Sequence, residues 1–473
     1  MSLGKIHKWL FIIVLMLMPI CSVHILPGLF KGWHINAAMI PLVLGMLVCL
    51  VDIKYCRNLL LEDENIKKIY RKIKFILLYT IFNTAIMYYI FLIGTTISNE
   101  LTKKSMYIIL LEVIVPFMIV TYSIVVTLIV GTKRTIKIIL ISMTIVVSYG
   151  YIQLLGTRTN SALFYNIYAF ISDKLDYIWG SASSYQYAMV SQRLNLTTPE
   201  AAEAGAIINI LYYTFIIPSI INNYTFFKRK VFGIFKVESI MFLFSLPIVV
   251  LSMSSNNYII LAIEIAVIIF YMLKNRKGVA NKIVIIISII TFGVIIGSLM
   301  LGIEGVFAER LDYYITKVTD LGNKSTSTRL GLMVANISIF LRFFINGCGI
   351  TNLGLLIPKY LPIWSFNEEI SLYLFDENKW LAGARTFRML SVNGVVGVIM
   401  IVSLIHYMNK IFKGYKNEFE KNIYGAFKFF VGISIIQGCT SGELKFIYLW
   451  VMCGLFVAAL KKFGRNEGGV LNE

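Results

Sequence analysis

The stretch Ser325–Gly349 reads STSTRLGLMVANISIFLRFFINGCG. It places Arg329 before a long apolar run, a second arginine inside that run, and a Gly-x-Gly, formed by Gly347 and Gly349, just past its end. The run predicts a helix at about 330–345, and the two glycines predict a tight backbone turn after it. A cation beside an apolar helix at a membrane is energetically costly, so we expect it to have an anionic partner.

The rest of the chain is apolar almost from end to end. Hydrophobic residues make up 58% of the 473 residues, charged residues make up 15%, and the mean hydropathy is +0.77. Uninterrupted apolar runs of about 20 residues exclude a soluble globular protein, and they lack the alternation of a membrane β-barrel. We therefore expect an all-α, polytopic membrane helical bundle that forms a single integral membrane domain over residues 1–473.

The apolar runs predict about twelve transmembrane helices, each long enough to cross the ~30 Å hydrocarbon core of a bilayer. They lie at about 9–28, 34–53, 74–94, 106–131, 135–155, 204–222, 237–253, 256–273, 282–302, 388–408, 423–438 and 444–460. Lysine and arginine gather in alternate segments between these runs. Because basic loops stay in the cytoplasm during insertion, this pattern predicts two cytoplasmic termini. It also accounts for the net charge of +19 without a nucleic-acid partner.

This topology leaves two large outward loops, 156–203 and 303–387, which together would form a roof over the bundle. Loops of this length usually have a function or a structure of their own. We interpret the helix at about 330–345 in the second loop as amphipathic or re-entrant, because a thirteenth span would break the charge bias.

Arginines in the first loop are candidates for anion binding. Arg158 follows a predicted span, and Arg193 precedes Thr198-Pro199-Glu200, which has the composition of a helix N-terminus. A helix N-terminus offers free backbone N–H groups to an anion. The alternative is that Arg193 is an ordinary interfacial cation beside a capped helix.

Arginines in the second loop are candidates of the same kind. Arg329 is expected at the start of a helix, where the macrodipole disfavours a cation unless the cation faces a bound anion. A guanidinium pairs with phosphate oxygens in a bidentate manner, which suits such a role. Arg385 and Arg388 lie where the loop enters the tenth span, and their alternative role is to extend toward the membrane interface.

The sequence lacks the signatures of several other chemistries. None of the four histidines falls in either large loop, which excludes a histidine base or a histidine-bound metal there. No HExxH, Walker A or dinucleotide-binding glycine pattern is present, and the six cysteines show no metal-ligand spacing. We therefore expect no metal and no cofactor.

The order of spans and loops resembles the O-antigen ligase/polymerase superfamily of bacterial membrane glycosyltransferases, in particular the Wzy-type polymerases of surface polysaccharides. Three segments are similar to motifs of that family: an Arg…Glu-Pro region before a span, an arginine followed by an amphipathic helix and a Gly-x-Gly, and a loop-exit segment. In this chain they are Ser191–Arg193 with Pro199-Glu200, Thr328–Gly349, and Arg385–Gly397. Proline and glutamate stand in swapped order in the first segment. The third lacks the histidine that ligases often carry, which favours a polymerase.

The resemblance implies a metal-independent polymerase of undecaprenyl-diphosphate-linked oligosaccharide repeat units, acting in O-antigen, capsule or exopolysaccharide biosynthesis. It would be a multi-pass protein of the bacterial plasma (inner) membrane with its active face outward. Its partners would be the lipid-linked oligosaccharide, membrane lipid, and the chain-length regulator and flippase of the same pathway.

The resemblance also assigns roles to the loop residues. Arg329 and Arg193 would be the catalytic cations that stabilise the leaving diphosphate, with three further arginines in support: Arg158, Arg385 and Arg388. The base for the acceptor hydroxyl would be a loop carboxylate, either Glu200 or Glu203.

Two alternatives remain open from the sequence. One is a ligase of the same superfamily, which transfers a finished glycan to a different acceptor. The other is a lipid-linked oligosaccharide flippase or another transporter, although such proteins usually place their charges inside a central cavity and often contain internal repeats. We find no such repeat in this chain.

Overall fold

The computed structural model describes residues 3–21, 36–94, 109–158, 161–175, 194–198, 201–227, 230–231, 235–252, 254–274, 324–375, 384–440 and 447–461. Within these residues the chain is helical apart from turns and one short antiparallel hairpin, formed by β1 (Lys230–Val231) and β2 (Phe235–Lys236). The expectation of a helical protein is therefore confirmed.

The N-terminal half contributes helices that mostly overlap the predicted apolar runs, but those at 53–62 and 162–175 lie in segments that were expected to be loops. They are α1 (Leu3–Leu17), α2 (Met39–Val51), α3 (Ile53–Glu62), α4 (Glu64–Gly94), the π-helical turn η1 (Leu110–Ile114), α6 (Val115–Val130), α7 (Thr132–Arg158), α8 (Ala162–Leu175), α10 (Ala201–Ile207), the π-helical segment η2 (Ile208–Tyr213) and α11 (Thr214–Ile221). Glycine marks one of the boundaries. Gly131 ends α6 with a φ of 90°, a conformation that favours glycine because it has no Cβ.

The C-terminal half is helical as well. It contains α12 (Val237–Leu251), α13 (Ser255–Lys274), α16 (Lys324–Arg342), the 3-10 turn η3 (Ile350–Asn352), α17 (Leu353–Tyr360), the 3-10 turn η4 (Ile363–Ser365), α18 (Glu368–Phe375), α19 (Arg385–Lys413), α20 (Glu418–Thr440) and α21 (Ile447–Ala458).

Five helical segments are long and apolar enough to cross a membrane: Glu64–Phe91, Leu110–Val130, Thr132–Thr157, Ala201–Ile221 and Arg385–Lys413. The pair α2 and α3, bent by 90°, would add a sixth if both helices belong to one span. All the predicted runs overlap a helix except 282–302, which lies outside the described residues. The chain thus has the helices of a membrane protein. Twelve crossings stay a prediction, because helices such as α12 and α21 are shorter than a full span.

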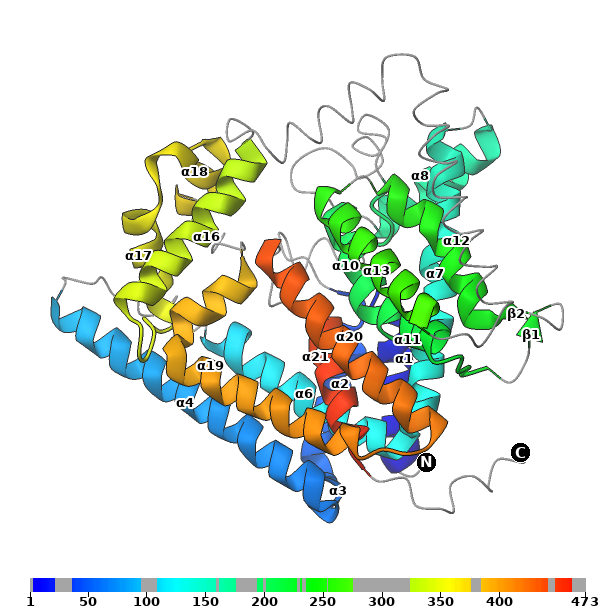
Figure 1. The fold of residues 1–473 in the computed structure, drawn as a ribbon, viewed down its shortest axis with the longest axis horizontal. Helices are drawn as coiled ribbons and strands as arrows, with labels where there is room; N and C mark the ends of the chain where they lie inside the picture. The colour runs from blue at the N-terminus through cyan, green and yellow to red at the C-terminus, as the bar shows by residue number, and fades with distance from the viewer. Residues whose placement is uncertain are drawn as a thin grey trace.

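A large apolar core is built around α6, α21 and the continuous segment α10–η2–α11 (Figure 1). The ring of Phe456 on α21 packs against those of Phe215 and Phe427, with centroids 6.0 and 5.7 Å apart. Close approach of α21 to α6 depends on Gly454, where an added Cβ would lie 2.5 Å from the Cβ of Ser123. Small residues at such interfaces let membrane helices pack closely.

A smaller unit, which we call the α16–α18 lobe, comprises residues 324–375 and lies over one end of the α4–α19 pair (Figure 1). It has an apolar core of its own, to which Ala335, Ile357 and Ile370 contribute from α16, α17 and α18. Much of the described part of the second predicted loop is therefore a packed helical unit. One helix of that loop was expected, whereas the structure contains α16, α17 and α18.

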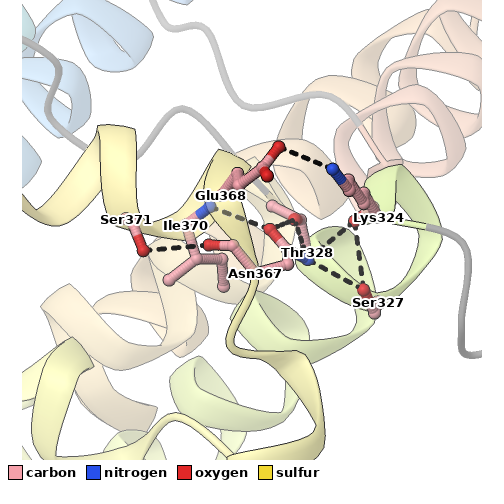
Figure 2. A network of polar contacts seen from close by, with 7 residues as sticks. All are labelled: Lys324, Ser327, Thr328, Asn367, Glu368, Ile370 and Ser371. Carbon is pink, nitrogen blue, oxygen red and sulfur yellow. Dashed lines mark hydrogen bonds and ion pairs between the residues drawn. The ribbon is translucent and has the colours of Figure 1, made fainter.

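The helix expected at about 330–345 is shifted toward the N-terminus, since α16 covers Lys324–Arg342. Ser327 and Thr328 lie inside α16 and not before it, because the side-chain amide of Asn367 holds both hydroxyl groups at 2.9 and 3.0 Å (Figure 2). The oxygen of the Asn367 side chain caps α18, because it accepts a hydrogen bond from the backbone N–H of Ile370 at 3.0 Å. Asn367 thus fixes the start of α18 on the first turns of α16.

Candidate functional site

Two buried arginines begin α19. Arg385 and Arg388 stand one helical turn apart, and only 4% and 5% of their surfaces are exposed. Arg388 Nη1 lies 3.3 Å from Oε1 of Glu112, which belongs to the π-helical turn η1. Arg385 Nη2 donates a 2.7 Å hydrogen bond to the backbone carbonyl of Ser434 on α20. These contacts join the first turn of α19 to two neighbouring helices.

One of the two arginines, Arg385, has no carboxylate partner among the described residues. Arg388 is ion-paired with the carboxylate of Glu112. Arg385 has a neutral carbonyl in place of a carboxylate, and its Nη1 makes no hydrogen bond to any described residue. A buried cation is costly without an opposite charge. An anion beside Arg385 would therefore be stabilised.

A break in α19 lies two turns beyond these arginines. Gly394 has a φ of 60° and a ψ of −169°, which are not helical values, so the helix bends there. The carbonyls freed at the break accept hydrogen bonds from the N–H groups of Cys348 and Gly349, at 2.8 and 3.1 Å. The freed N–H groups of Val395 and Val396 donate to the carbonyls of Phe344 and Ile345, at 2.8 and 3.2 Å. We call the two segments that these hydrogen bonds join, residues 344–349 and 391–396, the Gly347–Gly394 junction.

The glycines of the junction permit the close backbone contact. Gly347 and Gly349 have φ values of 76° and 74°, which L-residues with a side chain rarely adopt. A Cβ on Gly347 would lie 2.3 Å from the carbonyl oxygen of Val392, and a Cβ on Gly394 would lie 2.4 Å from the backbone nitrogen of Gly347. Gly394 breaks the helix, whereas Gly397 lies inside the helix near Tyr79 of α4.

A polar stripe on α4 completes the junction. The side-chain amide of Asn83 donates to the carbonyl of Asn346 at 2.7 Å, and the hydroxyl of Tyr79 donates to the carbonyl of Asn393 at 3.1 Å. Thr80 bonds the side chain of Asn393 at 3.1 Å. Because polar backbone groups at a helix break need partners inside a membrane, these α4 side chains explain how the break is tolerated.

Arg329 lies on α16, which is attached to α19 at two places. Oγ of Ser391 donates a 2.7 Å hydrogen bond to the side chain of Asn336, and just past the end of α16 the carbonyl of Phe344 accepts a hydrogen bond from the N–H of Val395. The two chain segments are therefore parallel between these contacts, running in the same N-to-C direction. Arg329 precedes Asn336 by two turns, roughly 10 Å, and Arg388 precedes Ser391 by one turn, so both arginines lie on the same side of the Asn336–Ser391 contact.

Arg329 differs from the buried pair in its exposure. It is half-buried, and among the described residues no hydrogen bond or ion pair involves it. It also lies inside α16, not at its first residue as expected, so an unfavourable interaction with the macrodipole is no longer the reason to expect an anion. Two reasons to expect an anion remain. The guanidinium N–H groups of Arg329 have no partner among the described residues, and Arg329 lies on the same side of the Asn336–Ser391 contact as Arg388.

The candidates of the first loop are described only in part. Arg158 is the last residue of α7, and Arg193 and Glu200 lie outside the described residues. The segment that follows Arg193, Leu194–Thr198, is buried, and the N–H of Leu196 bonds the side chain of Gln153 on α7 at 3.0 Å. The structure thus places Arg329 and Arg388 on two helices that contact one another, whereas the position of Arg193 lies outside the described residues.

The sequence interpretation did not include Glu112 among the site residues. A lone acidic residue within the apolar run 106–131 is a signal that it has a partner, since an ionised group in a membrane segment is rarely left unpaired. Its partner, Arg388, lies far away in the chain and could not be identified from spacing. No group of three or more His, Cys, Asp or Glu suited to a metal ion occurs among the described residues.

Comparison with known proteins does not assign the chain to a family. No family model matches the sequence, and no curated protein matches it.

Proposed function

We propose that the chain is a membrane glycosyltransferase that polymerises undecaprenyl-diphosphate-linked oligosaccharide repeat units for a bacterial surface polysaccharide. The observation that supports this most directly is Arg385 at the start of α19, a buried cation that has no carboxylate partner among the described residues. Lysines in the last turn of α19, Lys410 and Lys413, favour a cytoplasmic location for its other end. The arginine cluster then faces outward, where the lipid-linked units are joined.

The reaction requires stabilisation of a diphosphate leaving group. The acceptor hydroxyl of the next lipid-linked unit attacks the anomeric carbon of the growing glycan, and the bond from that carbon to the diphosphate oxygen breaks. The electron pair leaves with the lipid diphosphate, and a loop carboxylate, for which Glu200 is our candidate, takes the hydroxyl proton.

We assign different roles to the arginines according to their burial. Arg329 is half-exposed and has free donors, so it is our candidate for direct contact with the diphosphate. Arg385 and Arg388 are buried, and they supply a fixed positive potential behind that contact. Removing one such contact costs ~10²-fold in rate in comparable electrostatic sites. Arg193 and Arg158 are proposed as further contacts from the first loop.

The alternative function of a lipid-linked oligosaccharide flippase has one observation in its favour. Glu264 on α13 is fully buried, and neither of its carboxylate oxygens has a hydrogen-bond partner among the described residues. Ionisable groups within the membrane often mark transport paths. The broken helix α19 does not add to this argument, because the N–H groups exposed by the break already bond the carbonyls of Phe344 and Ile345 and are not free for a substrate.

The test is a reaction with purified protein in nanodiscs, a synthetic lipid-diphosphate repeat unit and separation of products by gel. We expect a ladder of products from the wild type and a loss of ~10²-fold in rate for Arg329→Ala. Arg342→Ala is the matched control, because Arg342 is an exposed arginine in the last turn of the same helix.

The outcomes separate the proposals. A single transfer to a different acceptor, without a ladder, would identify a ligase. Passage of the lipid-linked unit across a liposome bilayer, with no product formed, would identify a flippase. A ladder that Arg329→Ala and Arg342→Ala reduce equally would keep the polymerase and remove Arg329 from its site.

A further inference from the structure

Two cysteine side chains meet across the bend between α2 and α3. Cys49 lies near the end of α2 and Cys56 lies in α3, and their Sγ atoms are 2.9 Å apart. The two helices meet at 90°, with Asp52 between them. A disulfide bond has an S–S length of about 2.05 Å, so the sulfurs need to move together by less than 1 Å to be linked.

The pair is distinct from the other thiols of the chain. None of the six cysteines forms a disulfide bond, and among the described residues the Cys49–Cys56 contact is the single contact between two sulfur atoms. Cys56 is buried and Cys49 is half-buried. A small oxidant would therefore reach Cys49 first, and Cys56 is positioned to react with the oxidised sulfur.

We propose that Cys49 and Cys56 are a redox modification site, a dithiol that a hydroperoxide converts into a disulfide across the α2–α3 bend. Cys49 gives up its proton, and the thiolate Sγ attacks the peroxide, breaks the O–O bond and becomes a sulfenic acid; the departing oxygen takes up the proton and leaves as an alcohol or, from hydrogen peroxide, as water. The thiol of Cys56 then attacks that sulfur, and the sulfenic oxygen leaves as water. Two thiols are oxidised by two electrons and one hydroperoxide is reduced, so the step is balanced.

The position of the pair gives the modification a structural consequence. The charge pattern predicts that the segment 54–73, which contains Cys56, faces the cytoplasm. Cytoplasmic disulfides are usually transient and regulatory. The bond would fix the angle between α2 and α3, and α3 leads directly into α4, whose polar stripe supports the Gly347–Gly394 junction. The proposal does not depend on the polymerase activity.

The experiment treats the full-length protein in nanodiscs with hydrogen peroxide, denatures it, alkylates the free thiols with N-ethylmaleimide and maps the peptides by mass spectrometry. We expect the peptides containing Cys49 and Cys56 to escape alkylation and to be joined, with the loss of two hydrogen atoms. Dithiothreitol should restore alkylation of both. A synthetic dithiol peptide in the same tube confirms that the peroxide was active.

Three variants provide the controls. Cys49→Ser and Cys56→Ser should each abolish the joined peptide. Cys453→Ser should leave it unchanged, because Cys453 is half-buried like Cys49 but contacts no sulfur among the described residues. The proposal is overturned if both thiols of the wild type are alkylated while the synthetic dithiol is oxidised. It is also overturned if Cys49 is oxidised to the sulfinic or sulfonic acid to the same extent in the wild type and in Cys56→Ser.

Discussion

At the scale of single residues, the contact between Glu112 and Arg388 shows how a charge is accommodated in an apolar bundle. Only 13% of the Glu112 side chain and 6% of the Arg388 side chain are exposed. Breaking a buried ion pair by removing one partner leaves an uncompensated charge, which is far more destabilising than removing both. The two residues therefore have to be tested together.

We expect Glu112→Gln to lower the free energy of unfolding, by up to about 3–5 kcal/mol, because it removes the carboxylate that pairs with the buried Arg388. The double variant Glu112→Gln/Arg388→Met should recover much of that loss. Thermal unfolding of the four proteins in the same detergent gives the coupling energy as a double-mutant cycle. If the loss in the double variant equals the sum of the losses in Glu112→Gln and Arg388→Met, the pair is not coupled.

A second residue-scale prediction concerns pH. Lys324 lies against Glu368 at the surface, and its hydrogen bond and positive charge lower the pKa of the Glu368 carboxyl (Figure 2). A carboxyl with a lowered pKa in the folded state stabilises that state above the unfolded pKa, and the contribution is lost as pH falls through the folded pKa. The attachment of α18 to α16 should therefore weaken on acidification.

Hydrogen exchange of the first turn of α18 measures this attachment. Between neutral pH and the acid side of the ordinary glutamate range, protection corrected for intrinsic exchange should fall in the wild type. It should fall less in Glu368→Gln, which has no charge to lose. Since Glu368 is exposed, we expect a small difference. The same fall in both proteins would show that the ion pair does not contribute.

At the scale of elements, the Gly347–Gly394 junction joins α19 to the turn that follows α16 by backbone hydrogen bonds, and side chains of α4 support it. We expect Gly347→Ala and Gly394→Ala each to destabilise the protein, by at least the 1–2 kcal/mol of a side chain at positive φ. The added Cβ atoms would also meet backbone atoms at 2.3–2.4 Å. Thermal unfolding and hydrogen exchange of residues 344–349 report the effect.

Gly432→Ala is the matched control for these variants. Gly432 lies within α20, and a Cβ added there would meet nothing within 4 Å. Alanine is the better helix former, so this variant should be neutral or slightly stabilising. If Gly347→Ala behaves like Gly432→Ala, the close contact at the junction is not important for stability.

The elements also show what a sequence can and cannot predict. Continuous apolar runs predict helices well, because burial in lipid or protein leaves the backbone few other ways to satisfy its hydrogen bonds. The start of α16 was missed, because serine and threonine before Arg329 resemble a helix cap. Their bonding to Asn367, about 40 residues later, is a tertiary contact. The break at Gly394 was missed for the same reason, since its partners are the carbonyls and N–H groups of residues 344–349.

For the candidate site, the sequence indicated residues but not their surroundings, and their roles stay a prediction. Residue chemistry singled out Arg329, Arg385 and Arg388, and the structure brings α16 and α19 into contact near them. Burial was not predictable from spacing, and it separates the half-exposed Arg329 from the two buried arginines. The partner of Arg388 comes from η1, far away in the sequence, so only the folded chain identifies it.

At the scale of the whole molecule, the proposed function requires that the arginine cluster and the α16–α18 lobe face outward. The charge pattern predicts this orientation, with the loop between α19 and α20 in the cytoplasm. The arginine cluster and the loop between α19 and α20 lie at opposite ends of α19, a helix of 29 residues that would be roughly 44 Å long if it were straight. Labelling at two positions therefore distinguishes the two possible orientations.

We expect Ile363→Cys to react with a membrane-impermeant maleimide in intact cells, because Ile363 is 90% exposed and lies in the lobe. Lys416→Cys, at an exposed position between α19 and α20, should react only after the membrane is permeabilised. The parent protein, with its six native cysteines, gives the background. The reverse pattern would place the arginine cluster in the cytoplasm, and this result would contradict the proposed polymerase, because its repeat units are joined on the outer face. Labelling of both positions in intact cells would contradict the predicted path of α19 through the membrane.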